Sequence, residues 1–239
     1  MKIFAIGDLH LSSSMHKPMD IFGDKWRDHE AQLKTNWQRY VTEEDYVLIP
    51  GDISWAMRLA EAESDLNILE NLPGKKICIR GNHDYWWDRP GKLNRQYESI
   101  YFLQNTAYFI GELAICGTRG WISPNTVKWD MEDERLYQRE LERLKLSLNV
   151  ARGMKEIWVM LHYPPTYNKF VDSPLLALLE EYGVSKVIYG HLHDESSWQD
   201  ALQGNYKNIT YTLVSADYIG FKPVEIAQIP SSKINGETI

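Results

Sequence analysis

The sequence predicts an α/β fold, on three observations. Short apolar runs rich in β-branched residues recur along the chain, which is typical of buried strands. Amphipathic helical patterns lie between many of these runs in the first two-thirds of the chain, and strands dominate its end. The sequence contains no repeats, low-complexity tracts or linker-like runs, and 44% of its 239 residues are hydrophobic. A single domain covering residues 1–239 is therefore expected.

The strands are predicted from apolar runs of four to six residues, each of which is too short for a buried helix. In chain order they are residues 2–6, 46–49, 76–79, 107–110, 113–116, 157–161, 186–189, 209–214 and 224–229.

Helices are predicted for residues 28–41, 57–72 and 131–149, and for a segment that begins after Ser173 and runs through Glu180. In residues 131–149 the side chains of Tyr137, Leu141, Leu144 and Leu148 recur at helical spacing, opposite a face of Glu and Arg. The pair Ser173-Pro174 predicts an N-cap followed by proline at the first helical position.

The composition limits the possible functions. A formal net charge of −7 and a pI near 5.5 argue against a surface that grips extended nucleic acid, although a local positive site is still allowed. Cys78 and Cys116 each lie inside an apolar run, so we expect buried core thiols. No run approaches the roughly 18–20 apolar residues that span a bilayer, and no signal-peptide pattern follows Met1. We therefore expect a cytoplasmic protein with no membrane partner.

Metal-ligand residue types follow directly after five of the predicted strands. They are Asp8 and His10, then Asp52, then Asn82, His83 and Asp84, then His162, and finally His191 and His193. Sites in α/β sheets form beyond the carboxyl ends of the strands, where separate loops converge, so these side chains are expected to meet. Since Asp8 and His10 are two residues apart, extended backbone would point both to one side, and the same spacing holds for His191 and His193.

The donor set consists of carboxylates, imidazoles and one amide, with no thiolate. It suits Mn, Fe, Zn, Co or Ni and argues against iron–sulfur or cysteine–zinc sites. Two metals about 3.5–4 Å apart need a bridging ligand, and a carboxylate is the natural one.

The ordered motifs resemble those of the calcineurin-like metallophosphoesterases. The set consists of D-x-H, G-D, G-N-H-D, a later His after a strand, and G-H-x-H, and it spans residues 8 to 193. The resemblance implies two packed mixed β-sheets flanked by helices, a four-layer sandwich, with two divalent metal ions per chain at the strand ends. It also implies hydrolysis of a phosphate ester by a water activated between the metals, and Mn is the ion we most expect to support activity.

The resemblance also implies a role for each motif residue. Asp8, His10 and His193 would hold the first metal, and Asn82, His162 and His191 the second, with Asp52 bridging both. The catalytic residues would be the bridging Asp52 and His83. His83 matches the family's non-ligand histidine, which contacts the phosphate and protonates the leaving group. A histidine titrating near pH 6.5 suits that work.

One departure from the family's motifs narrows the range of expected substrates. Its protein phosphatases continue the G-D loop as G-D-x-x-D-R-G, whereas here Gly51-Asp52 is followed by Ile-Ser-Trp-Ala-Met. The acidic partner and the phosphate-gripping arginine are both missing, which argues against a phosphoprotein substrate. The favoured substrate is a phosphate mono- or diester of a small molecule, and a nucleotide-like compound is one candidate. The alternatives are a nuclease acting on short nucleic acid and a catalytically silent metal-binding scaffold; the complete ligand set with His83 favours an enzyme.

Other residues near the motifs have two possible roles. Asp84 either orients His83 or supports the loop. Arg58, Arg80 and Arg119 are candidate phosphate contacts or ordinary surface and ion-pair arginines. Trp55, Trp86 and Trp87 either line the mouth of the site or pack in the core.

Overall fold

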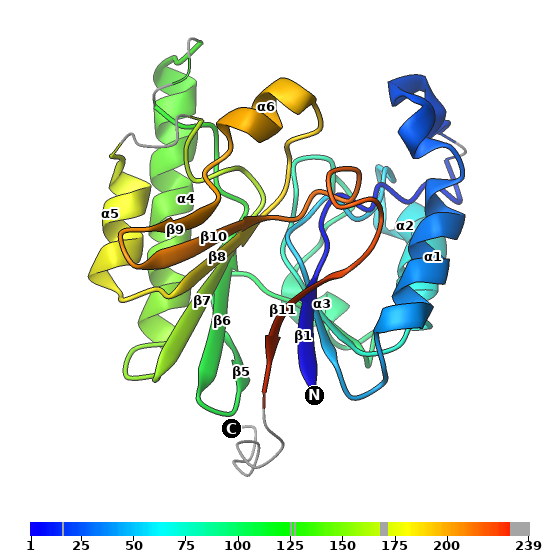
Figure 1. The fold of residues 1–239 in the computed structure, drawn as a ribbon, viewed down its shortest axis with the longest axis horizontal. Coiled ribbons are helices and arrows are strands. Elements are labelled where there is room, and N and C mark those ends of the chain that lie inside the picture. Colours follow the sequence, from blue (N-terminus) through cyan, green and yellow to red (C-terminus); the bar gives the residue numbers. More distant parts are fainter. Residues whose placement is uncertain (16, 125, 127, 168–171, 230–239) are drawn as a thin grey trace.

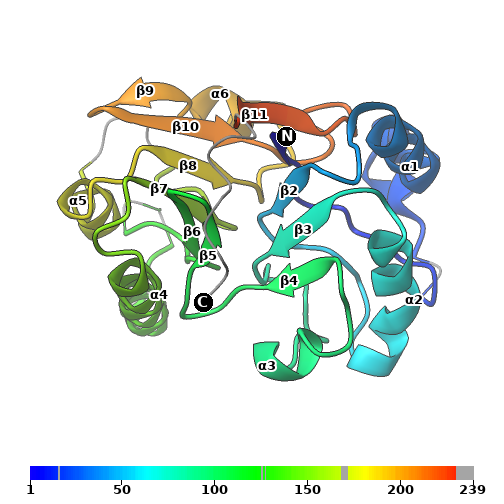
Figure 2. The same cartoon turned by 90° about the horizontal axis from the view of Figure 1, so that it is seen from below.

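Two β-sheets pack face to face, and helices cover both outer faces (Figures 1 and 2). The computed structural model describes residues 1–15, 17–124, 126, 128–167 and 172–229. Within these residues, no helix is both long and apolar enough to cross a membrane.

The first sheet has the order β11-β1-β2-β3-β4, in which β1 to β4 are parallel and β11 runs antiparallel to β1. Its strands are β1 (Lys2–Ala5), β2 (Tyr46–Ile49), β3 (Lys75–Cys78), β4 (Ile100–Phe102) and β11 (Val224–Gln228). Because the first four strands are parallel, their carboxyl ends all lie at the same edge of the sheet.

The second sheet has the order β5-β6-β7-β8-β10-β9, with a parallel centre and one antiparallel strand at each edge. Its strands are β5 (Tyr108–Ile110), β6 (Leu113–Thr118), β7 (Glu156–Leu161), β8 (Lys186–Tyr189), β9 (Gly204–Tyr206) and β10 (Ile209–Leu213). The inner faces of the two sheets share one apolar cluster that includes Ile3, Leu48, Ile77, Trp158 and Ile188.

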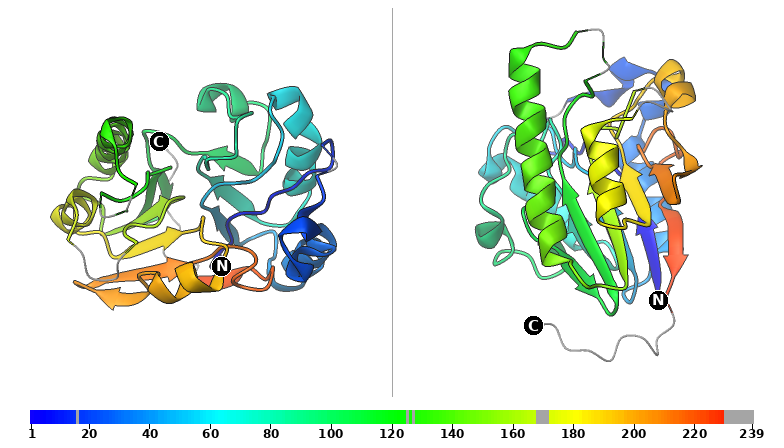
Figure 3. Two further views of the ribbon diagram at one scale, coloured as in Figure 1. Left: turned by 90° about the horizontal axis from the view of Figure 1, so that it is seen from above. Right: turned by 90° about the vertical axis from the view of Figure 1, so that its left-hand side faces the viewer.

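The helices form the two outer layers, with α1, α2 and α3 on the first sheet and α4 and α5 on the second (Figures 2 and 3). They are α1 (His29–Tyr40), α2 (Leu59–Glu70), α3 (Pro90–Leu93), α4 (Met131–Val150), α5 (Pro174–Glu181) and α6 (Glu195–Asp200), and two 3₁₀ turns cover Met19–Phe22 and Asp24–Trp26. The four-layer α/β sandwich is confirmed.

Each predicted strand and helix is present, with ends shifted by a few residues. The apolar positions of α4 pack against the second sheet, and the Oγ of Ser173 accepts a hydrogen bond from the Leu176 N–H at 3.2 Å, as an N-cap does. Cys78 and Cys116 are buried and free, as expected. The sequence missed β4, β9, α3 and α6, whose three to six residues are too few for a periodic pattern.

Candidate metal centre

The loops that follow the parallel strands meet at one edge of the two sheets, at the top of Figure 1. There Gly7, after β1, forms a parallel bridge with Ser215, after β10. The Gly7 N–H donates to the Val214 carbonyl at 2.7 Å, and the Gly7 carbonyl accepts from Ala216 at 3.0 Å. This bridge joins the two sheets beside Asp8, so loops from both sheets contribute to one site.

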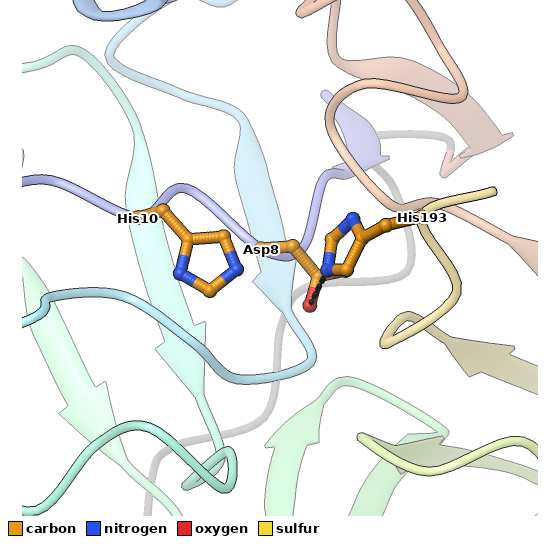
Figure 4. Close-up of side chains that lie close together, drawn as sticks. All are labelled: Asp8, His10 and His193. Atoms are coloured by element: carbon orange, nitrogen blue, oxygen red, sulfur yellow. Dashed lines mark ion pairs between the residues drawn. The ribbon is translucent and has the colours of Figure 1, made fainter. Parts of the chain in front are cut away.

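The first group of candidate ligands consists of Asp8, His10 and His193, here called the aspartate half. One ligand atom of each residue lies within 4.8 Å of the other two. His193 Nε2 is 3.7 Å from Asp8 Oδ1. Figure 4 shows the loop after β1 supplying Asp8 and His10, with the His193 ring meeting the Asp8 carboxylate from the loop after β8.

The second group consists of Asn82, His162 and His191, here called the asparagine half. His162 Nε2 and His191 Nδ1 lie 2.6 and 3.0 Å from Asn82 Oδ1, and 3.2 Å from each other. Two ring nitrogens and an amide oxygen therefore converge on one point, as they would around a borderline cation.

Asp52 lies between the two halves. Its Oδ2 is 3.7 Å from His10 Nε2 in the aspartate half and 3.4 Å from His162 Nε2 in the asparagine half. The structure thus brings together all seven predicted ligands. His10 Nδ1 is buried and has no hydrogen-bond partner among the described residues. A buried donor set of carboxylates, rings and one amide fits bound divalent cations.

The backbone that presents these side chains differs from the extended geometry that the sequence suggested. Asp8, His10, Asp52 and His191 have φ of 56°, 47°, 53° and 75°, all in the left-handed region. Such conformations are uncommon for residues with a Cβ, and they cluster at functional sites. Loop hydrogen bonds stabilise them, including Asp8 N–H to the Gly51 carbonyl and His10 N–H to the Asp52 carbonyl, both at 3.0 Å.

Gly81 and Gly190 allow the carboxylates to approach the neighbouring loops. A Cβ on Gly81 would collide with Asp52 Oδ1, and a Cβ on Gly190 would collide with Asp8 Oδ2. No side chain fits at either place without moving a predicted ligand, which explains the glycine before each of these motifs.

Burial shapes the electrostatics of the centre. It raises the pKa of Asp8 to about 6, and it raises the pKa of Asp52 well above its usual value, with further contributions from the charges of Asp84 and Asp8. Burial also lowers the pKa of His191 to about 3 and that of His162 well below its ordinary value. Without cations these carboxyl groups hold protons more readily than exposed aspartates do, and these rings stay neutral and able to act as ligands.

Two of the histidine rings are oriented by contacts of their Nδ1 atoms with groups outside the ligand set. His162 Nδ1 lies 3.0 Å from the Pro50 carbonyl, and an N–H there directs Nε2 toward the site. His193 Nδ1 lies 3.0 Å from Asp217 Oδ1, whose other oxygen pairs with Lys25 Nζ at 2.7 Å. Asp217 is not among the residues predicted from the sequence, although it follows the predicted strand 209–214 as the other site residues follow theirs.

Asp84 supports the loop rather than His83. Its buried carboxylate accepts backbone hydrogen bonds from Asp52, Ile53, Ser54 and Gly81 at 2.7–3.2 Å, and one from the Trp86 ring. It therefore clamps the loop of Asp52 to the loop that carries Asn82 and His83.

His83 lies half-buried beside Asp52, and its backbone N–H donates to Asp52 Oδ1 at 2.8 Å. Its ring contacts Trp55 at a centroid distance of 4.3 Å, and Trp55 in turn stacks on His10 at 4.6 Å. Trp55 thus borders the site, whereas Trp86 and Trp87 are buried and pack in the core. Burial, and then Lys17 and His193, lower the pKa of His83 to about 4, below the range that the sequence suggested.

The chain is similar to several known proteins. Two curated relatives are the gene 66 proteins of Mycobacterium phages D29 and L5, which are 38% and 30% identical over 84 and 93 residues. Those stretches cover 34% and 39% of this chain, and this chain spans only 41% and 42% of those relatives.

Among solved structures, the phosphopantetheinyl hydrolase PptH of Mycobacterium tuberculosis superposes with a TM-score of 0.56 at 12% identity, covering 96% of both chains. A protein of unknown function from Aquifex aeolicus superposes with a TM-score of 0.52 at 16% identity, covering 94% of this chain and 95% of that one. At these identities the two structures show a shared fold. The model of the calcineurin-like phosphoesterases matches residues 1–195, and this chain belongs to that family of metal-dependent phosphohydrolases.

Proposed function

We propose that this chain hydrolyses phosphate mono- or diesters of small molecules at a centre of two divalent metal ions. The observation that carries the proposal is the position of Asp52. One of its oxygens lies within 4 Å of a histidine from each half of the centre, where a bridging ligand is needed.

In this proposal Asp8, His10 and His193 would hold one ion, Asn82, His162 and His191 would hold the other, and Asp52 would serve both. When bound, the two ions supply Lewis acidity to the phosphoryl oxygens and lower the pKa of a nearby water. The protein fixes the ligand positions through the left-handed turns and through the Asp84 clamp. It also excludes bulk water, because Asp8, Asp52 and His162 are almost fully buried.

His83 is assigned to the substrate rather than to a metal. With a pKa near 4 its ring is neutral in the free site, and a bound phosphate dianion would favour the protonated form. The ring can then donate a proton to the departing oxygen, held in place by its contact with Trp55.

The substrate class rests on the loop after Asp52 and on charge. This loop lacks the arginine of the family's protein phosphatases, and a net charge of −7 disfavours long nucleic acid. A similar structure is named a phosphopantetheinyl hydrolase, so a phosphopantetheine ester is a sensible member of a substrate panel.

The test is a panel of phosphate monoesters, diesters and short oligonucleotides, incubated with metal-stripped protein to which Mn, Co, Ni, Zn or Mg is added. We expect activity on small esters with Mn or another borderline ion and little with Mg, because Mg prefers oxygen ligands. Metal content measured by mass spectrometry should approach two ions per chain. Full activity with Mg alone, or preference for oligonucleotides, would count against the proposal, and metal uptake without any hydrolysis would indicate a scaffold.

A further inference from the structure

A polar pocket outside the candidate metal centre lies between the ends of β3 and β6 and the middle of α4. Its volume is about 180 Å³. Its charged lining consists of Arg80, Arg119, Arg139, Arg143 and Glu140. The lining thus has four arginines and one glutamate, so it carries excess positive charge on a protein that is acidic overall.

Glu140 cannot neutralise this excess. Its Oε1 lies 2.7 Å from Arg143 and 3.7 Å from both Arg119 and Arg139, so one oxygen is shared among three cations. Its Oε2 accepts a hydrogen bond from the Thr118 hydroxyl at 2.6 Å. The carboxylate is therefore fully engaged, while much of the hydrogen-bonding capacity of the arginines remains for a ligand.

Arg119 is the most constrained of the four arginines. Its side chain is only 15% exposed, and its Nε is buried without a hydrogen-bond partner among the described residues. Burial lowers its pKa, and the charges of Arg80 and Arg139 lower it further, against the effect of Glu140. A buried cation with an unused donor beside like charges is stabilised by an anion.

Two pocket arginines lie on or next to loops that carry predicted metal ligands. Arg80 directly precedes Gly81 and Asn82, and its Nε donates to the Asp84 carbonyl at 3.1 Å. The Arg119 carbonyl accepts the backbone N–H groups of His162 and Tyr163 at 3.0 Å. Arg80 therefore shares a loop with the predicted ligand Asn82, and the loop of Arg119 is hydrogen-bonded to the one that carries His162.

We propose that this arginine pocket binds a phosphoryl-type dianion at a position separate from the metals. Guanidinium groups present paired donors that match phosphate oxygens, and several of them around one cavity favour a doubly charged ligand. The dianion has two possible sources. It is either free phosphate or the second phosphate of a substrate, and the latter alternative rests on the proposed function.

The first experiment measures binding of inorganic phosphate to the full chain by calorimetry, both metal-stripped and loaded with Mn. Arg139→Gln and Arg143→Gln remove one pocket charge each at partly exposed positions, and should weaken the metal-independent binding roughly tenfold each. Arg143→Lys should give an intermediate loss. Arg135→Gln is the matched control, because Arg135 lies on α4 but is exposed and paired with Glu132.

Wild-type phosphate affinity in both pocket variants and in their double variant would overturn the proposal. This measurement needs no catalysis, so it separates failure of the pocket from failure of the proposed function. The second experiment compares kcat/KM for adenosine 3′,5′-bisphosphate with that for adenosine 5′-monophosphate. A ratio that falls in Arg143→Gln assigns the pocket to a second substrate phosphate, and an unchanged ratio with lost phosphate binding assigns it to free phosphate.

Discussion

The two halves of the candidate metal centre have matching sets of ligands but different charge. Each offers two histidines and one oxygen ligand, yet the oxygen belongs to the carboxylate of Asp8 in one half and to the neutral amide of Asn82 in the other. The groups that hold the histidine rings in place also differ in charge between the two halves. His193 is backed by the Asp217 carboxylate, whereas His162 is backed by the Pro50 carbonyl.

This difference shows in the pKa of one ring of each half, His193 and His191, whereas burial lowers the pKa of His10 in the aspartate half as well. Asp217 and Asp8 raise the pKa of His193 despite its burial, while burial lowers the pKa of His191 to about 3. The aspartate half therefore attracts positive charge more strongly. We expect it to take up the first metal ion and to release its ion last.

The largest expected effect comes from removing the residue common to both halves. Asp52→Ala should abolish uptake of both ions and lower activity at least roughly 10⁴-fold, because each ion loses an anionic ligand. Metal content and turnover are the measurements, with Asp172→Asn, an exposed aspartate paired with Lys207, as the control. Retention of one tightly bound ion would show that the halves are independent.

His83→Ala tests a residue outside both halves. The rate should fall roughly 10²–10⁴-fold if general acid work is lost, while metal content stays near wild type. The loss should be smaller for nitrophenyl esters, whose leaving group departs with little protonation. If the variant loses a metal instead, His83 is a ligand and the division into two halves is wrong.

Asp217→Asn sharpens the comparison by weakening one half only. Outer carboxylates typically contribute 10- to 100-fold to metal affinity, so the first binding step should weaken by roughly that factor. The second step should change little, since no ligand of the asparagine half contacts Asp217 among the described residues. Manganese titration followed by electron paramagnetic resonance separates the two steps, and equal weakening of both would refute the assignment.

The smallest effect is the pH dependence of the two steps. Burial raises the pKa of Asp8 to about 6, and Asp217 and Asp8 raise the pKa of His193, so below about pH 6 protons on both residues compete with the metal and its affinity should fall at least about tenfold per pH unit. Asn82 does not titrate, and His191 stays neutral above about pH 4. Asp52 belongs to both halves, so its titration changes the metal affinity of both equally. Between pH 5 and 6 the affinity of the aspartate half should therefore change more steeply with pH than that of the asparagine half. Parallel slopes would contradict the comparison.

Much of this site could be predicted from the sequence, because its signals are local. A buried strand, a turn and then a ligand residue is a short pattern, and it identified Asp8, Asp52 and His162 as well as the remaining predicted ligands. The same pattern after β10 would have pointed to Asp217, but a lone aspartate after a strand is too common to single out.

The conformation and the supporting contacts could not be predicted, because they depend on distant segments. The left-handed backbone of Asp8 and Asp52 depends on hydrogen bonds between loops. The Asp84 carboxylate reaches a loop about 30 residues away in the chain. The arginine pocket likewise needs α4 to be placed beside the ends of β3 and β6.

The His191 N–H donates to the Asp8 carboxylate across 183 residues of chain. A contact between segments so far apart in the chain forms only after the intervening chain has folded. The first motif of the sequence therefore gains this contact only once the last motif has been synthesised. A nascent chain that has exposed only β1 to β3 presents Asp8, His10 and Asp52 without their later partners. If these residues hold metal as proposed, full metal affinity is expected only in chains whose second sheet has formed.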